Sequence, residues 1–428
     1  MPFVAEAGTL AAVPLVSGIR PEFVILALTL LGIALFYKRT MLIAFTGLAL
    51  VLCVKLLFIP GFSVTEQLIG TAGRAGEWKI LLNLTGLLLG FAILAKYFEE
   101  SGIPAILPDI LPGDWKGGLV LLFLIMLISA FLDNIAAAMI GGSIAMVVFK
   151  GKLHMGFLAA IVAASNAGGA GSVLGDTTTT MMWISGVGFL TVLHAFIASL
   201  AAFAVFGTIA ARQQYRFQRI QKDVTQERAL DYGKLAIVIM MLIAAVVTNR
   251  TLGFPAAGVW AVIILASVIR KVPWKVLPNA LQGTLFLVPL VACASLMPVE
   301  ALPKASWQST FILGFLSAVF DNIPLTKLCL EQGGYDWGLL AYAVGFGGSM
   351  IWFGSSAGVA LSGMYPESKS AVNYVKGGWH VALAYIAGFF VILGLSGWHP
   401  ETLSSQPVHQ TEYTATHLLR PESQRLVN

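Results

Sequence analysis

Two Asp-Asn pairs are the residues of this sequence that most clearly offer chemistry. Asp133-Asn134 stands in the phrase Ser-Ala-Phe-Leu-Asp-Asn-Ile, and Asp321-Asn322 stands in Ser-Ala-Val-Phe-Asp-Asn-Ile, each inside a long apolar segment. Carboxylate and amide oxygens are ligands that hard cations prefer, whereas softer metals prefer histidine or cysteine. The repetition therefore predicts an ion or solute site between two related halves of the chain.

Further polar residues stand in equally apolar surroundings. Asp176 leads into the run Thr177–Thr180, and amide and hydroxyl oxygens are added by Asn134, Asn166, Asn322, Ser355 and Ser356. An acidic side chain at the centre of a membrane helix costs about 2.5–3.5 kcal/mol, so each aspartate must be neutralised. Basic partners are few at this depth, namely Lys55, His194 and Lys327, of which Lys327 is an option for Asp321. Bound cations or protons are the more economical prediction.

The composition indicates that these segments lie in a membrane. Hydrophobic residues make up 57% of the 428-residue chain, charged residues make up 11%, and the mean hydropathy is +0.84, which is too apolar for soluble domains. The net charge of +5 comes from basic residues in the connections, which favours a role in orientation over nucleic-acid binding. The apolar runs do not alternate as in a membrane β-barrel. We therefore expect an all-α polytopic membrane protein.

The apolar runs differ in length and continuity. Two long runs, 117–149 and 308–330, carry the Asp-Asn pairs and are predicted to be re-entrant helical hairpins. Two others, 156–184 and 338–364, are interrupted by polar and glycine-rich residues and are predicted to be broken helices, which are tolerated only beside protein or a watery cavity. Ordinary spans are expected at 21–37, 40–60, 80–97, 189–211, 234–249, 254–270, 281–298 and 377–396.

The order of these elements predicts two repeats. The expected organisation is an N-terminal segment (1–20) without a removable signal, a first transmembrane repeat (21–211), a basic cytoplasmic linker (212–232), a second repeat (233–396) and a polar tail (397–428). With the linker in the cytoplasm, most basic residues of the short connections, among them Lys38, fall on the same side. The first hairpin then enters from the cytoplasm and the second from the opposite face. This arrangement predicts inverted-topology repeats.

One phrase carries a family resemblance. The run Ser-Asn-Ala-Gly-Gly-Ala-Gly-Ser-Val-Leu-Gly-Asp-Thr-Thr-Thr-Thr from Ser165 to Thr180, with the two hairpin tips, resembles the ion transporter superfamily of arsenite, citrate and sodium carriers, and within it the NhaD-type sodium/proton antiporters. The resemblance covers roughly residues 79–396 and implies two inverted repeats that share one ion site. It implies that the functional polar residues are Asp133, Asn134, Asn166, Asp176, Thr178, Thr179 and Asp321, with Glu99 and Glu100 at a further acidic position suited to proton or pH sensing.

Together with the buried carboxylates, this resemblance implies a secondary active transporter that exchanges sodium or lithium for protons. Cation and proton would compete for the buried carboxylates, with sodium at Asp133, Asp176 and Asp321. An occupied site is nearly neutral and can pass the hydrophobic barrier as one bundle moves against the other, whereas an empty charged site cannot. We expect no cofactor and no enzyme activity. The expected partners are small cations and the lipid of a bacterial inner membrane, with a homodimer left open.

Other interpretations fit part of the pattern. A sodium- or proton-coupled carrier of organic anions such as citrate would use the same scaffold, although fixed negative charge would repel its substrate. An intramembrane aspartyl protease also needs two membrane carboxylates, but the glycine before Asp176 is not preceded by the first glycine of the Gly-x-Gly-Asp motif. The Asp-Asn pairs are also suited to capping the hairpin tips, Thr177 and Thr180 to packing, and Glu99 and Glu100 to a solvated helix end.

Overall fold

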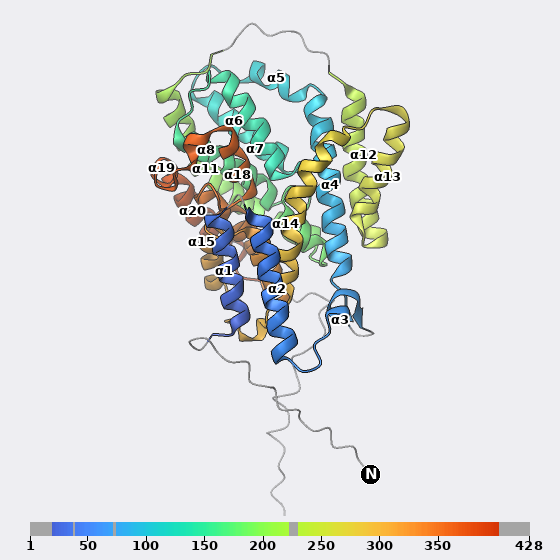
Figure 1. Cartoon of the computed structure of the whole chain (residues 1–428). Coiled ribbons are helices and arrows are strands. Elements are labelled where there is room, and N and C mark those ends of the chain that lie inside the picture. The colour runs from blue at the N-terminus through green and yellow to red at the C-terminus, as the bar shows by residue number, and fades with distance from the viewer. Residues whose placement is uncertain (1–18, 37–38, 72–73, 222–229, 402–428) are drawn as a thin grey trace, which may run out of the picture.

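The fold is almost entirely helical (Figure 1). The computed structural model describes residues 19–36, 39–71, 74–221 and 230–401. Within those ranges the strands are β1 (Gly70–Thr71) and β2 (Arg74–Ala75), which pair in a short antiparallel hairpin. Lys38, nearly all of the N-terminal segment, the middle of the linker and most of the C-terminal tail lie outside the described residues. The predicted all-α class is confirmed.

The helices follow the predicted order with several short additions. The first part of the chain forms α1 (Pro21–Leu35), α2 (Thr40–Phe58), α3 (Val64–Ile69), α4 (Trp78–Glu100), α5 (Ile103–Ile110), α6 (Trp115–Ser129), α7 (Asn134–Val148), α8 (Met155–Ala170), α9 (Thr177–Ile184), α10 (Phe189–Leu193) and α11 (Ala195–Phe217). The second part forms α12 (Tyr232–Leu252), α13 (Pro255–Ile269), α14 (Leu277–Ser295), α15 (Trp307–Ser317), α16 (Asn322–Gln332), α17 (Trp337–Gly347), α18 (Ser356–Met364), α19 (Ala371–Gly377) and α20 (Trp379–Ser396). Short 3-10 turns are η2 (Trp274–Val276), η3 (Val299–Ala301), η4 (Gly348–Met350) and η5 (Pro366–Lys369).

Several of these helices are suited to crossing a bilayer. Among the described residues, six helical segments are long and apolar enough to span a membrane: Thr40–Phe58, Trp78–Glu100, Phe189–Phe217, Tyr232–Leu252, Trp274–Ser295 and Trp379–Ser396. Large apolar side chains face outward, as on α13, where Val268 and Ile269 are 84% and 83% exposed. Lipid tails are the solvent that suits such a surface. The chain is a multi-pass integral membrane protein.

The two Asp-Asn stretches each fold into a pair of helices, as predicted. α6 contacts α7, and α15 contacts α16. The helices of the first pair have 15 residues each and those of the second pair have 11, which correspond to lengths of about 22 Å and 16 Å at 1.5 Å per residue. Both lengths are shorter than the ~30 Å hydrocarbon layer. These lengths agree with hairpins that enter the membrane and turn back.

An aspartate fixes the turn at each hairpin tip. Asp133 is the N-cap of α7, and its carboxylate accepts a hydrogen bond from the Ile135 N–H at 3.1 Å. Asp321 is the N-cap of α16 and accepts from the Ile323 N–H at 3.0 Å. An N-cap aspartate satisfies one of the helix-end N–H groups that lack a partner within the helix. The capping role considered for the Asp-Asn pairs is therefore present at both tips.

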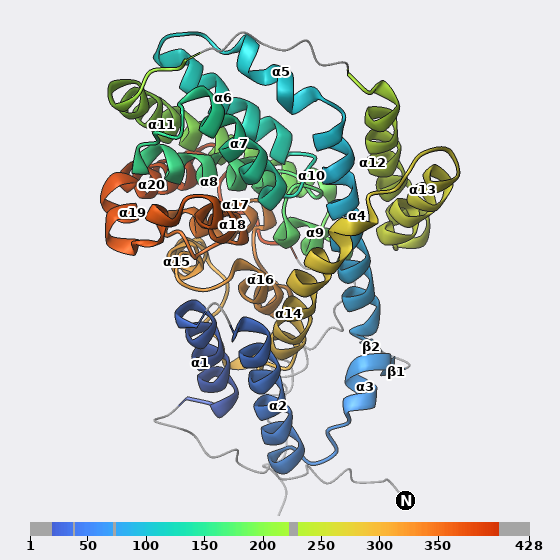
Figure 2. The same cartoon turned by 45° about the horizontal axis from the view of Figure 1, so that its top comes forward.

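The two interrupted runs are broken helices, as predicted. In the first half α8 ends at Ala170 and α9 begins at Thr177. In the second half α17 ends at Gly347, η4 continues it to Met350, and α18 begins at Ser356. α8 and α17 contact each other, and nearly all of their residues are buried. Figure 2 shows these helices in the middle of the molecule, with α1, α2, α12 and α13 around the edge. The breaks therefore lie at the centre of the fold.

The broken helix of each half packs against the hairpin of the other half. α9 contacts α16, and α18 contacts α7. Within each half, a hairpin serine bonds the broken helix: Ser129 Oγ donates to the Ser165 carbonyl at 2.6 Å, and Ser317 Oγ donates to the Val344 carbonyl at 2.7 Å. The same construction thus occurs twice, and it brings both hairpin tips to both breaks.

One boundary differs from the prediction. α11 continues past Arg212, where the linker was expected to begin, and ends at Phe217. Gln214 is buried in this extension and holds it in place: its Nε2 donates to the Lys152 carbonyl at 3.0 Å, and its Oε1 accepts from the His154 N–H at 2.8 Å. The polar sequence suggested a loop, but these partners lie far away in sequence and stabilise a helix.

Candidate functional site

The three predicted aspartates lie near one another at the helix breaks. Asp133 and Asp321 are half-buried at the two hairpin tips, and Asp176 is 2% exposed at the start of α9. The Asp176 carboxyl interacts electrostatically with both of the other aspartates. Asp176 therefore occupies the central position between the tips of the two hairpins.

Asp176 has one carboxylate oxygen that is not used for folding. Its Oδ1 caps α9 by accepting a hydrogen bond from the Thr178 N–H at 3.1 Å. Its Oδ2 is buried and makes no hydrogen bond with any of the described residues. The Thr178 hydroxyl is also buried and lies close to the same carboxyl, but it makes no well-formed hydrogen bond. A buried polar atom of this kind needs a partner, because leaving it unsatisfied costs about 1–3 kcal/mol or more.

A chain of side-chain amides connects the first hairpin tip to the second half. Asn134 Nδ2 donates to Asn166 Oδ1 at 3.0 Å, and Asn166 Nδ2 donates to Ser349 Oγ at 2.9 Å. All three side chains are at least 97% buried. The Tyr374 hydroxyl continues the network by donating to the Ser349 carbonyl at 3.3 Å. The structure thus brings the predicted residues Asn134 and Asn166 into direct contact.

The other threonines after Asp176 hold the break closed. Thr179 Oγ1 donates to the carbonyls of Ser172 at 2.5 Å and Asp176 at 3.0 Å, and Thr180 Oγ1 donates to the Val173 carbonyl at 2.8 Å. The Ser172 and Val173 carbonyls lie in the break between α8 and α9, where backbone groups must be satisfied at membrane depth, whereas the Asp176 carbonyl also accepts from the Thr180 N–H at 2.9 Å. The geometry gives Thr179 and Thr180 a local structural role, and the ion-binding role of Thr179 stays a prediction.

The predicted residues of the second half are arranged differently. Asn322 follows Asp321 at the tip and is 3% exposed. Ser355 is buried and occupies the N-cap of α18, where its Oγ accepts from the Gly358 N–H at 3.3 Å, and Ser356 is half-buried. Ser355 therefore caps the second broken helix as Asp176 caps the first. The two breaks match in construction but not in charge.

Lys327 does not neutralise Asp321, contrary to the option considered from the sequence. Its ammonium group forms ion pairs with Glu77 at 2.9 Å and Glu331 at 2.6 Å, and its side chain is 2% exposed. Lys327 follows Asp321 by six residues, and its ammonium group reaches Glu331, one turn further along the same helix. The lysine instead ties the second hairpin to Glu77 at the start of α4.

Glu99 and Glu100 lie at the far end of α4. Glu99 pairs with Lys96 at 2.9 Å and Glu100 pairs with Lys234 at 2.8 Å, and both carboxylates are partly exposed. Neither pair involves the central aspartates. The structure places these residues at a solvated helix end, and their role in proton or pH sensing stays a prediction.

Some polar residues at this site were missed from the sequence. Ser349 completes the amide chain, and Ser129 and Ser317 tie the hairpins to the broken helices. Ser129 and Ser317 begin the two repeated Asp-Asn phrases, so the repetition was a signal that could have found them. Ser349 follows a Gly-Gly pair in the second half, as Ala170 does in the first, and the serine in place of alanine was the available signal.

The oxygen atoms of the site determine which ions it suits. Within the described ranges, no three Asp, Glu, His or Cys side chains converge as a metal centre. Hard cations prefer oxygen ligands such as the carboxylate of Asp176 and the hydroxyl of Thr178.

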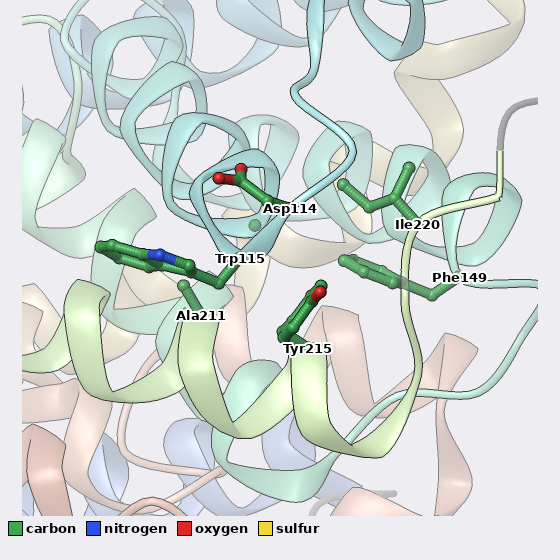
Figure 3. A pocket seen from close by; sticks show the side chains of 7 residues that line it. Asp114, Trp115, Phe149, Ala211, Tyr215 and Ile220 are labelled. Carbon is green, nitrogen blue, oxygen red and sulfur yellow. The ribbon is translucent and has the colours of Figure 1, made fainter.

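A separate hollow is lined by residues other than Asp133, Asp176 and Asp321. Figure 3 shows it at the start of α6 and the end of α11, lined by Asp114, Trp115, Phe149, Ala211, Tyr215 and Ile220. The guanidinium group of Arg212 lies 4.8 Å from the centre of the Trp115 ring. None of the predicted site residues lines this hollow.

A multi-pass helical membrane protein with carboxylates at two hairpin tips and a buried carboxylate at one of two helix breaks belongs to the class of membrane transporters. The sequence model of the citrate transporter family matches residues 23–347, and the chain belongs to this family. The expectation of a transporter in place of an enzyme is thereby confirmed.

Curated relatives are similar over much of the chain. It is 28% identical over 340 residues to sodium/proton antiporter 1 of Arabidopsis thaliana, covering 68% of this chain and 58% of the relative. It is 28% identical over 335 residues to the Na(+)/H(+) antiporter NhaD of Alkalimonas amylolytica, covering 64% and 68%. The NhaD of Vibrio parahaemolyticus is 26% identical over 329 residues, covering 64% and 79%. The chain thus spans less than two thirds of the plant protein, and the predicted resemblance to NhaD-type antiporters is confirmed.

Proposed function

We propose that this protein exchanges sodium or lithium ions for protons across the membrane. The observation that carries the proposal is Asp176 Oδ2, a buried carboxylate oxygen without a hydrogen-bond partner among the described residues, between the two hairpin tips. The antiporter names of the relatives support the same activity. The transported cation and the proton are substrates, and no cofactor is part of the proposal.

Exchange follows from competition for one carboxylate. A buried negative charge is unfavourable in a low-dielectric site, so Asp176 binds either a proton or a cation. Binding of one excludes the other, so a cation released on one side leaves a site that a proton can fill. Asp133 and Asp321 lie within electrostatic range and strengthen the attraction for positive ions. We assign the neutral ligands to Asn134, Asn166, Thr178, Thr179, Asn322, Ser355 and Ser356, and a proton- or pH-sensing role to Glu99 and Glu100.

The repeated construction supports an alternating-access mechanism. Each hairpin contacts the broken helix of the opposite half, so a movement of one pair against the other would open the site to one side and close it to the other. The matching bonds of Ser129 and Ser317 agree with two structural repeats. We propose that the repeats have inverted topology, as the distribution of basic residues predicts.

Transport of an organic anion is the second candidate. The name of the family supports it, because the matching sequence model describes citrate transporters. The buried Asp176 carboxylate is evidence against an anion at the same place, because like charges repel strongly in a low-dielectric site.

An assay in everted vesicles separates the two candidates. In vesicles from a host that lacks sodium/proton antiporters, an imposed pH gradient should collapse when sodium or lithium is added. Replacing Asp176 with Asn should abolish this response. Asp114→Asn is the matched control, because Asp114 also caps a helix, accepting from the Lys116 N–H at 3.0 Å, but lies outside the site. Uptake of labelled citrate with no response to sodium or lithium would establish the anion carrier instead.

A further inference from the structure

Gly345 lies against the free oxygen of Asp176. A Cβ atom added to Gly345 would stand 3.3 Å from Asp176 Oδ2 and 3.3 Å from Ala170 Cβ. Gly345 belongs to α17, and Asp176 caps α9, so the contact joins the second half to the first. Both distances are shorter than an ordinary van der Waals contact, so a methyl group at residue 345 would crowd the one carboxylate oxygen that folding does not use.

The backbone does not require a glycine at this position, but the packing of α17 against α8 leaves little room for a side chain. Gly345 has helical backbone, and its hypothetical Cβ meets the Cβ and Cα of Ala170 but no closer backbone atom. Gly347 differs, because a Cβ there would overlap the backbone of Gly314. A glycine within a helix is less favourable than alanine by about 1 kcal/mol. At Gly345 the atoms that a methyl group would crowd are the Ala170 side chain and the free oxygen of Asp176, both at 3.3 Å.

The corresponding position in the first half is filled. The pairs Gly168 and Gly347, Gly169 and Gly348, and Asp176 and Ser355 share one separation along the chain, and the same separation relates Asn166 to Gly345. Asn166 fills its position with an amide that bonds Asn134 and Ser349. Gly345 carries no side chain. The position beside the buried acid therefore has no side chain, whereas its counterpart in the first half carries an amide.

We infer that Gly345 sets the size of the cation that Asp176 accepts, an inference that rests on the proposed cation transport. A cation bound to Asp176 Oδ2 needs room for itself and for its other oxygen ligands. Cation–oxygen distances shorten with ionic size, from about 2.3–2.6 Å for calcium to about 2.0–2.1 Å for magnesium. A methyl group at residue 345 would therefore exclude larger ions first. The native glycine admits sodium as well as lithium.

The test compares lithium, sodium and potassium in wild type and in Gly345→Ala. The apparent affinity of each ion is measured from the collapse of the pH gradient in everted vesicles. In Gly345→Ala the ratio of sodium to lithium affinity should fall about tenfold, the discrimination that a methylene-sized change in a pocket produces. Gly363→Ala is the matched control, because Gly363 is also helical and a Cβ there meets nothing within 4 Å. This control should keep the wild-type ratio.

A second variant separates a change in pocket size from a general loss of folding. Ala170→Gly removes the methyl group that faces residue 345, so the double variant Ala170→Gly/Gly345→Ala should recover part of the sodium affinity. Binding to purified protein, measured as thermal stabilisation by each ion, should follow the same order. The inference is overturned if both variants keep the wild-type sodium-to-lithium ratio, or if both fail to fold. Either result leaves the proposed function intact. A wild type that responds to no cation overturns the proposed function and the inference with it.

Discussion

The side-chain amide of Asn134 at the first hairpin tip donates a 3.0 Å hydrogen bond to Asn166 Oδ1 in the broken helix α8. Asn166 in turn donates to Ser349 of the second half at 2.9 Å. Because all three side chains are buried, the network holds hairpin, broken helix and second half in one arrangement.

Removal of Asn166 should therefore affect both halves at once. Asn166→Ala leaves Asn134 and Ser349 without their partner and should lower the unfolding free energy by about 1–3 kcal/mol for each unsatisfied group. The double variant Asn134→Ala/Asn166→Ala should cost less than the sum of the single variants by about 0.5–3 kcal/mol. Thermal unfolding in detergent measures the four proteins. Strictly additive effects would show that the bond contributes nothing to stability.

Thr178 and Thr180 should separate ion binding from stability. The Thr180 hydroxyl donates to the Val173 carbonyl at 2.8 Å, whereas the buried Thr178 hydroxyl makes no well-formed hydrogen bond. Thr180→Val should therefore lower stability by about 1 kcal/mol and leave ion affinity nearly unchanged. Thr178→Val should weaken sodium binding with little loss of stability. Each variant serves as the control for the other, and equal effects on binding would rule out a special role for Thr178.

Proton competition at Asp176 should make sodium affinity depend on pH. Below the pH at which the empty carboxyl releases its proton, a cation must displace that proton. The apparent dissociation constant for sodium should therefore rise about tenfold for each unit by which the pH is lowered. Above that pH the affinity should level off. Titrating sodium against purified protein at a series of pH values measures the relation. A sodium affinity that stays constant at all pH values would mean that cation and proton do not share a site.

Lys327 should be essential for stability and not for ion choice. Lys327→Met leaves the carboxylates of Glu77 and Glu331 without the ammonium group between them and should cost about 3–5 kcal/mol of unfolding free energy. Adding Glu77→Gln should restore part of the loss, because one uncompensated charge is removed. The sodium-to-lithium preference of the variant that folds should match wild type. A shift in that preference would show that Lys327 acts on the central aspartates.

The sequence was sufficient for the elements that depend on local pattern. Apolar length predicted the spans, and the repeated Asp-Asn phrases predicted both hairpin tips, because a capping aspartate acts on N–H groups within two residues. The polar and glycine-rich interruptions predicted the two broken helices for a similar reason. Continuous helix and unwound backbone have different local compositions in a membrane.

The ion-pair and hydrogen-bond partners of side chains could not be predicted from the local sequence in the same way. Lys327 is six positions from Asp321 in sequence, yet it pairs with Glu77 and Glu331, because the direction of α16 and its packing near α4 decide which carboxylates it reaches. The local sequence does not distinguish Ser349 from other small residues. Its hydrogen bond with Asn166 depends on the packing of α17 and η4 against α8.

The sequence by itself determined that this chain is a helical membrane protein with acidic residues at both hairpin tips and at one helix break, since hydropathy and capping are properties of short segments. Only the tertiary structure decided that Asp176 is the central acid, that its Oδ2 has no partner among the described residues and that a methyl group at Gly345 would stand 3.3 Å from it. Those facts depend on how distant helices cross. No local pattern specifies the distance between two side chains on different helices.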